Sequence, residues 1–113
     1  MKKYNMKLLP EYFDYIKFGT KRIELRLNDE KRNGLEVGDL IIFEKIDEEE
    51  YLNTKVKKIY KYDNFNELVD NFEIDVLADK SINKEELLKT LNNIYTKEQQ
   101  NTYGVLGIEI ELV

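Results

Sequence analysis

The segment of residues 19–27, which reads GTKRIELRL, places the strongest constraint on the fold. Behind its leading glycine, apolar and charged side chains alternate one by one. Because successive side chains of a β-strand point to opposite faces, this pattern predicts a strand with one buried face and one polar face. The polar face carries Arg22, Glu24 and Arg26, and Lys21 lies just before the strand. A solvated strand face does not need so dense a group of charges, so we predict that this segment carries the function.

Turn and cap residues divide the rest of the chain into further elements. Pro10 suits the first turn of a helix that runs to Phe18, where Gly19 ends it. Asn64 and Asn83 each stand three residues before a glutamate, a pattern that starts a helix. Apolar or alternating segments over residues 4–8, 40–43, 52–62 and 103–113 predict further strands, the last of which begins near Tyr103, and residues 96–99 predict a short final turn.

The order of these elements predicts the fold class. Within the strand over residues 52–62, Val56 and Ile59 do not share a face of a regular strand, so we expect a bulge near Lys57 and Lys58. Strands dominate both ends of the chain and helices fill the gaps. We therefore predict an α+β fold, a small mixed β-barrel with peripheral helices, formed by a single domain over residues 1–113.

The absence of two residue types narrows the chemistry. The sequence contains no histidine and no cysteine, which removes the usual transition-metal sites and the Cys/His and Ser/His nucleophile systems. A general base must then be a carboxylate or a lysine. The acidic residues 47–50 are expected to form a solvated hairpin tip, and we expect neither a metal nor a cofactor. No apolar run approaches the length of a membrane helix, and no signal peptide is recognised, so a cytoplasmic location is expected.

The charge is unevenly distributed along the chain. The net charge of −5 argues against a protein that coats nucleic acid by bulk attraction. Residues 17–32, however, contain six basic and three acidic side chains, and a second basic stretch contains Lys55, Lys57, Lys58 and Lys61 without any acid. A polyanion can therefore be bound by a local patch while the remaining surface repels it.

Three motifs, in this order, carry a resemblance to a known family. They are Gly19-x-Lys21-x-x-Glu24-x-Arg26, the segment VGDLIIF over residues 37–43 and the segment YGVLGI over residues 103–108. Together they resemble the ASCH domain, the activating-signal-cointegrator homology domain of the PUA-like superfamily, over nearly the whole chain. The resemblance implies a PUA-like β-barrel with helices around a cleft that Lys21, Glu24 and Arg26 line. It also implies a module that binds RNA or a nucleotide, in RNA metabolism or translation regulation.

The resemblance extends only in part to an enzymatic branch of that family. One bacterial branch is an amidohydrolase that removes the acetyl group of N4-acetylcytidine, and Lys21 stands where that branch has its catalytic lysine. Arg22 and Glu24 stand where the same branch has threonines. The branch also uses a glutamate before the last long helix, and neither Asp75 nor Asp79 can be assigned to that role. Another family member has been described as a ribonuclease.

Each charged residue has an expected role. Lys21 serves as a charged ligand-binding group rather than as a neutral base, because the carboxylate of Glu24 stabilises its ammonium form. Arg26 offers a planar fork for a phosphate or the edge of a base, and Glu24 either orients it or accepts hydrogen bonds from the amino group of a base. We further expect ligand contacts from Arg22, from Tyr103 by stacking on a base, and from Lys57 and Lys58 as a phosphate track.

The sequence leaves three functions open. The first is binding of RNA or a nucleotide in the cleft. The second is a small hydrolase, an amidohydrolase or a ribonuclease, in which Lys21 or Glu24 transfers the proton. The third is a regulatory module whose acidic surface meets a protein partner. The identity of the ligand, the choice between RNA and DNA, and the oligomeric state do not follow from the sequence.

Overall fold

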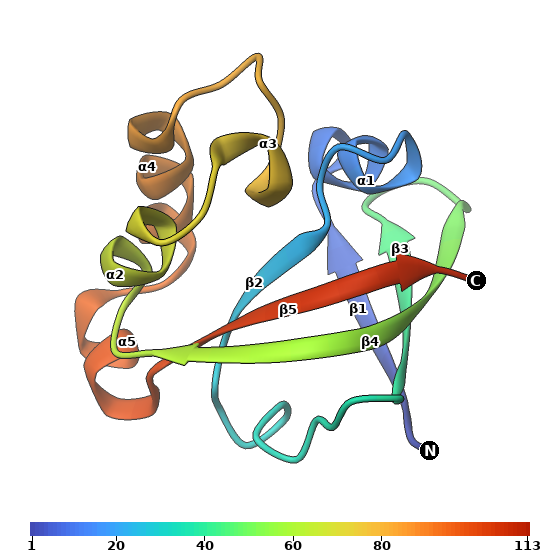
Figure 1. Ribbon diagram of the computed structural model, residues 1–113, viewed down its shortest axis with the longest axis horizontal. Coiled ribbons are helices and arrows are strands. Elements are labelled where there is room, and N and C mark those ends of the chain that lie inside the picture. The colour runs from blue at the N-terminus through green and yellow to red at the C-terminus, as the bar shows by residue number, and fades with distance from the viewer.

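The computed structural model describes residues 1–113 and contains one five-stranded sheet and five helices (Figure 1). In chain order the elements are β1 (Lys3–Leu8), α1 (Pro10–Lys17), β2 (Ile23–Leu27), β3 (Leu40–Lys45), β4 (Tyr51–Tyr62), α2 (Phe65–Asp70), α3 (Ile74–Leu77), α4 (Lys84–Ile94), α5 (Lys97–Tyr103) and β5 (Val105–Leu112). This arrangement confirms the predicted α+β fold with peripheral helices. None of the helices has the length and apolarity needed to cross a lipid bilayer.

The sheet is curled into a half-barrel. Its strand order is β1-β3-β4-β5-β2, in which β1 and β3 are parallel and the other neighbours are antiparallel. The first two strands of the chain therefore lie at opposite edges of the sheet. Curling brings these two edges close to each other. The Arg26 guanidinium on β2 donates a hydrogen bond of 2.7 Å to the carbonyl oxygen of Lys7 on β1.

Local sequence signals account for most element boundaries. Pro10 begins α1, and Gly19 follows its C-terminus with a φ of 88°, a value that glycine adopts without strain. The side chains of Asn64 and Asn83 accept hydrogen bonds from the backbone N–H groups three residues on, as predicted for both caps. The expected bulge is also confirmed, because the β4–β5 register shifts between Val56 and Lys58.

Two apolar clusters form the core. The first lies inside the curl of the sheet, where α1 packs onto β1, β3, β4 and β5. The second lies where α2, α3 and α4 pack on β2, as Figure 1 shows on the side of the sheet away from α1. One face of β2, formed by Ile23, Leu25 and Leu27, belongs to this second cluster, which agrees with the alternation in its sequence.

The structure corrects three expectations. The polar face of β2 is not solvated, since Glu24 is 4% exposed. Tyr103 does not begin the last strand but is the final residue of α5, which is a helix of seven residues rather than a short turn. Residues 74–77, for which no element was predicted, form the short helix α3. Burial of both faces of β2 has the largest consequence, because it places ionised groups inside the molecule.

Candidate functional site

A cleft of about 310 Å³ lies between the β1–α1 junction and α4. Its charged side is formed by Lys21 and by Glu24 and Arg26 of β2, with Leu25 between the last two in sequence. Tyr12 of α1 and Tyr95, which follows α4, also line it. The remaining lining is mostly aliphatic and comes from Leu8, Leu9, Ile46, Leu87, Leu91 and Ile94, together with Lys7 and Thr90. The cleft thus combines apolar walls with one compact group of charges.

The turn after α1 directs the side chain of Lys21 into the cleft. The left-handed conformation of Gly19 reverses the chain, and the backbone N–H groups of Thr20 and Lys21 both donate to the carbonyl oxygen of Tyr15. The next residue, Arg22, donates its backbone N–H to Val76 and thereby attaches β2 to α3. As a result, the Lys21 side chain is buried at the start of β2 and is 2% exposed.

Lys21 makes three polar contacts at its ammonium nitrogen. Nζ donates to the carbonyl oxygens of Ile23 at 2.6 Å and Leu77 at 2.8 Å, and it lies 3.2 Å from Oε1 of Glu24. The nitrogen also lies 5.8 Å from the ring centroid of Tyr12. Because an ammonium has three N–H groups, these oxygens use its full donor capacity.

The carboxylate of Glu24 joins the two cations of the cleft. Its Oε1 faces Lys21, and its Oε2 accepts a hydrogen bond of 2.7 Å from Nε of Arg26. Arg26 extends beyond this pair to the carbonyl oxygen of Lys7. Glu24 and Lys7 engage two of the five guanidinium N–H groups, and the Tyr95 side chain is a further hydrogen-bond partner of the same guanidinium. The Arg26 side chain is 11% exposed, against 2% for Lys21. Arg26 is therefore the member of the cluster that retains donors for a ligand.

Burial and mutual attraction act against each other in this cluster. Burial lowers the pKa of Lys21, and this effect outweighs the stabilisation of the ammonium by Glu24. Burial alone would raise the pKa of Glu24, but Arg26 and Lys21 together hold it below its ordinary value. The three oxygens around the Lys21 nitrogen all require a proton from it, so we assign Lys21 as an ammonium at neutral pH. The cluster then carries one net positive charge.

The other predicted ligand residues lie elsewhere. Arg22 and Lys57 line a second cavity, of about 480 Å³, which shares only Lys21 with the cleft. Lys58 lies over the ring of Tyr60, 4.9 Å from its centroid, and lines neither cavity. Tyr103 likewise lies outside both. The structure thus brings Lys21, Glu24 and Arg26 together, as the predicted site requires, and separates the remaining four residues from them.

Part of the cleft was missed by sequence reasoning. Tyr12 was assigned only to the apolar side of α1, although its ring faces Lys21. One wall of the cleft comes from α4 and the residue after it, and includes Thr90, Leu91 and Tyr95. The spacing of the apolar residues in this helix had indicated only a face packed against the core. Their position depends on how α4 packs against β2, a contact for which the sequence contains no local signal.

Comparison with known proteins identifies the class to which this fold and cleft belong. A family model of the ASCH domain matches residues 6–113. The chain belongs to the ASCH domain family, and the resemblance noted in its sequence is confirmed.

Two solved structures are similar over nearly the full length of the chain. One is the crystal structure of the hypothetical protein PH0355, with 40% sequence identity and a TM-score of 0.86, covering 98% of this chain and 99% of the other. The second is the solution NMR structure of protein PF0455 from Pyrococcus furiosus, with 33% identity and a TM-score of 0.77, covering 98% and 97% of the two chains. No curated protein matches the chain.

Proposed function

We propose that this ASCH protein binds single-stranded RNA and takes one unpaired base into the cleft beside Lys21, Glu24 and Arg26. ASCH domains are generally regarded as RNA-binding modules of the PUA-like type. The observation that carries the proposal is the state of Arg26. Its guanidinium is fixed by Glu24, Lys7 and Tyr95, and its remaining N–H groups lie at the charged side of an otherwise apolar cleft.

The lining of the cleft suits a base better than a phosphate alone. Its volume of about 310 Å³ lies at the lower end of the range for small-ligand pockets, about 300–1,000 Å³. A base offers flat apolar faces to the aliphatic walls and to the rings of Tyr12 and Tyr95, and carbonyl or ring-nitrogen acceptors to Arg26. A phosphate would meet the Arg26 donors but would leave the apolar walls unused.

The overall charge predicts how such binding depends on salt. With a net charge of −5, the protein cannot hold RNA by general attraction, so few phosphates are neutralised on binding. Each neutralised phosphate of a single strand contributes about −0.7 to the slope of log K against log salt. We therefore expect a slope between about −0.7 and −1.4, which corresponds to one or two phosphate contacts.

Fluorescence anisotropy with a labelled single-stranded RNA of mixed sequence tests the proposal. Replacing Arg26 by alanine is expected to weaken binding about tenfold or more, because hydrogen bonds to a charged group are lost. Arg32→Ala is the matched control, since Arg32 pairs with Asp29 and lines neither cavity. Circular dichroism establishes that both variants are folded. Equal affinity of Arg26→Ala and wild type would show that RNA does not use this cleft.

A hydrolase is the second candidate function, and one observation favours it. Burial lowers the pKa of Lys21, which is the change that a lysine acting as a base requires. The geometry argues for binding instead, because the nitrogen has three acceptor contacts and its ammonium is paired with Glu24. Mass spectrometry of a short RNA containing N4-acetylcytidine separates the two functions. We expect intact RNA after incubation, whereas loss of the acetyl group or chain cleavage, abolished in Lys21→Ala, would establish the enzyme.

A further inference from the structure

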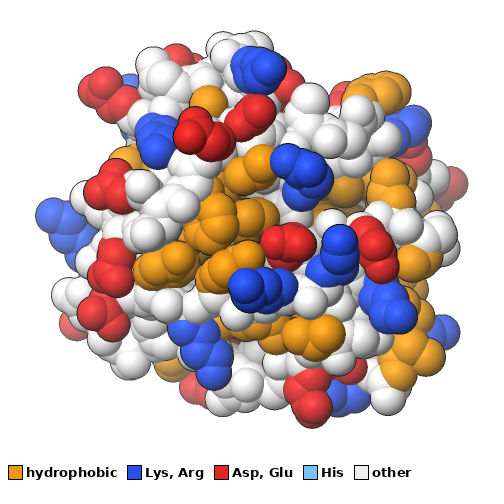
Figure 2. Space-filling model, viewed as in Figure 1, with side chains coloured by type: hydrophobic (Ala, Val, Ile, Leu, Met, Phe, Trp, Pro, Cys, Tyr) orange, Lys and Arg blue, Asp and Glu red, His pale blue; other side chains and the backbone are white.

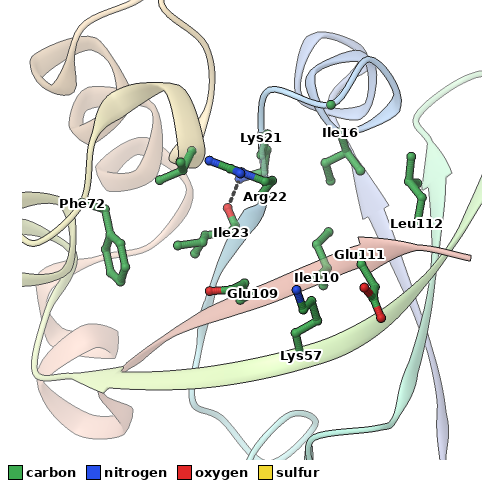
Figure 3. Close-up of a pocket in the computed structure, with 12 residues that line it drawn as sticks. Ile16, Lys21, Arg22, Ile23, Lys57, Phe72, Glu109, Ile110, Glu111 and Leu112 are labelled. Atoms are coloured by element: carbon green, nitrogen blue, oxygen red, sulfur yellow. Dashed lines mark hydrogen bonds between the residues drawn. The ribbon is translucent and has the colours of Figure 1, made fainter.

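The second cavity lies where the start of β2 meets the C-terminal half of β5, and no residue of α4 lines it. Figure 3 shows Arg22 at the start of β2, near the turn after α1, and Glu109 and Glu111 along β5, with Lys57 of β4 beside them. Its volume of about 480 Å³ exceeds that of the RNA cleft, and only Lys21 lines both. A ligand bound here would therefore be independent of the RNA proposed above.

The charges around this cavity have few partners within the protein. Arg22 is exposed, and no side chain forms an ion pair or hydrogen bond with its guanidinium. Neither Lys57 nor Glu111 takes part in an ion pair, although both line the cavity. Glu109 accepts one hydrogen bond, of 3.2 Å, from the hydroxyl of Tyr60. The lining thus presents free cationic and anionic groups together, with no net charge among these four side chains.

An apolar surface lies between the charges. Ile23, Phe72 and Val76 line the side formed by β2 and the α2–α3 region, and Figure 2 shows apolar side chains gathered in the middle of this face with charged groups of both signs around them. Phe72 packs edge-on against Tyr60, with ring centroids 5.0 Å apart, which fixes its ring as part of the wall. A ligand that fills this cavity therefore needs an apolar body as well as charged groups.

We propose that this cavity binds a small zwitterion with an apolar body, an α-amino acid with a large apolar side chain. Its carboxylate pairs with the guanidinium of Arg22, and its ammonium pairs with Glu109 or Glu111. The side chain lies against Phe72. A phosphodiester has no cationic group to pair with Glu109 and Glu111, so the cavity suits a zwitterion better than a continuation of an RNA track.

NMR titration of the ¹⁵N-labelled full chain with L-phenylalanine tests this proposal. We expect saturable shifts of amide resonances confined to the residues around Arg22, Phe72 and Glu109. N-acetyl-L-phenylalanine, which lacks the ammonium, and L-phenylalaninamide, which lacks the carboxylate, are each expected to bind about tenfold more weakly. Absence of saturable shifts, or equal affinity for the free and capped compounds, would overturn the proposal.

Variants locate the two charged contacts. Arg22→Ala is expected to weaken binding of L-phenylalanine about tenfold, and Glu109→Gln together with Glu111→Gln to weaken it by a similar factor, while Arg32→Ala leaves it unchanged. Unchanged affinity in Arg22→Ala would refute the assigned orientation and with it the proposal. Arg26→Ala provides the distinction from the RNA cleft, because it is expected to lose RNA while it retains the amino acid.

Discussion

The buried carboxylate of Glu24 provides the sharpest prediction. Glu24→Gln retains the shape of the side chain but removes the negative charge that faces Lys21 at 3.2 Å and Arg26 at 2.7 Å. Removing one partner of a buried ion pair costs about 3–5 kcal/mol, because the remaining charge is left buried without compensation. The glutamine oxygen still accepts one hydrogen bond, and the Arg26 guanidinium keeps its bond to the carbonyl oxygen of Lys7. We therefore expect the lower end of that range, a loss of about 3 kcal/mol.

Urea denaturation at 25 °C and pH 7, followed by circular dichroism, measures this loss as a change in the free energy of unfolding. Domains of this kind have a total stability of about 5–15 kcal/mol, so the variant is expected to remain folded in water. Glu30→Gln is the matched control, because Glu30 is exposed and forms no ion pair, and its effect is expected to stay within about 0.5 kcal/mol. A loss in Glu24→Gln no larger than that of the control would refute the described cluster.

The difference in unfolding free energy between wild type and Glu24→Gln is also expected to depend on pH. Burial by itself would raise the pKa of Glu24, but the two cations lower it below its ordinary value of 4.5. A carboxylate with a lowered pKa in the folded state stabilises the fold above its ordinary pKa, and this stabilisation is lost as the pH falls through the folded-state pKa. The difference in unfolding free energy between wild type and Glu24→Gln should thus be constant from pH 7 to about 5 and shrink below 4.5. A difference that does not change with pH would contradict an ionised Glu24.

Three further substitutions test other parts of the account. Lys21→Met should lower the free energy of unfolding in urea denaturation by about 2 kcal/mol, because two carbonyl oxygens lose their donor. This loss is smaller than that of Glu24→Gln, since the carboxylate of Glu24 keeps its ion pair with Arg26. A larger loss than that of Glu24→Gln would contradict the assigned pairing. Asp39→Ala should cost about 1–3 kcal/mol, since its carboxylate accepts bonds of 2.9 and 2.8 Å from two backbone N–H groups, and a cost near zero in the same assay would refute that role. Gly104→Ala should lower the unfolding free energy by about 1–3 kcal/mol, because the backbone at Gly104 has a φ of 72° and a ψ of −178°. An added Cβ would also lie 3.2 Å from the carbonyl oxygen of Tyr62. An unchanged unfolding free energy would contradict this backbone conformation.

Those features of the fold that depend on neighbouring residues were predicted from the sequence. The caps at Asn64 and Asn83 and the glycine that ends α1 act within one helical turn, so their residue types are sufficient evidence. The bulge at residues 56–58 also follows from local alternation, because two apolar residues at odd spacing need the same face.

The burial of the charged cluster could not be predicted in this way. Its contacts join residues far apart in the chain, since Lys21 donates to Leu77 and Arg26 donates to Lys7. Alternation along β2 indicates which side chains share a face, but it does not say what covers that face. Lys21 illustrates the difference, because the sequence predicted a charged ligand-binding group and the structure shows an ammonium whose donors are occupied by the protein.

The most direct test of the proposed cleft is to observe the Arg26 side chain while RNA binds. Titration of the ¹⁵N-labelled protein with a short single-stranded RNA is followed by the Nε–Hε resonance of Arg26. This resonance reports on the guanidinium whose remaining N–H groups are proposed to contact the base. Arg32, which is paired with Asp29 outside the cleft, serves as an internal reference. We expect the Arg26 resonance to shift in a saturable manner while that of Arg32 stays in place. Saturable RNA binding with an unperturbed Arg26 resonance, or no binding at all, would contradict the account.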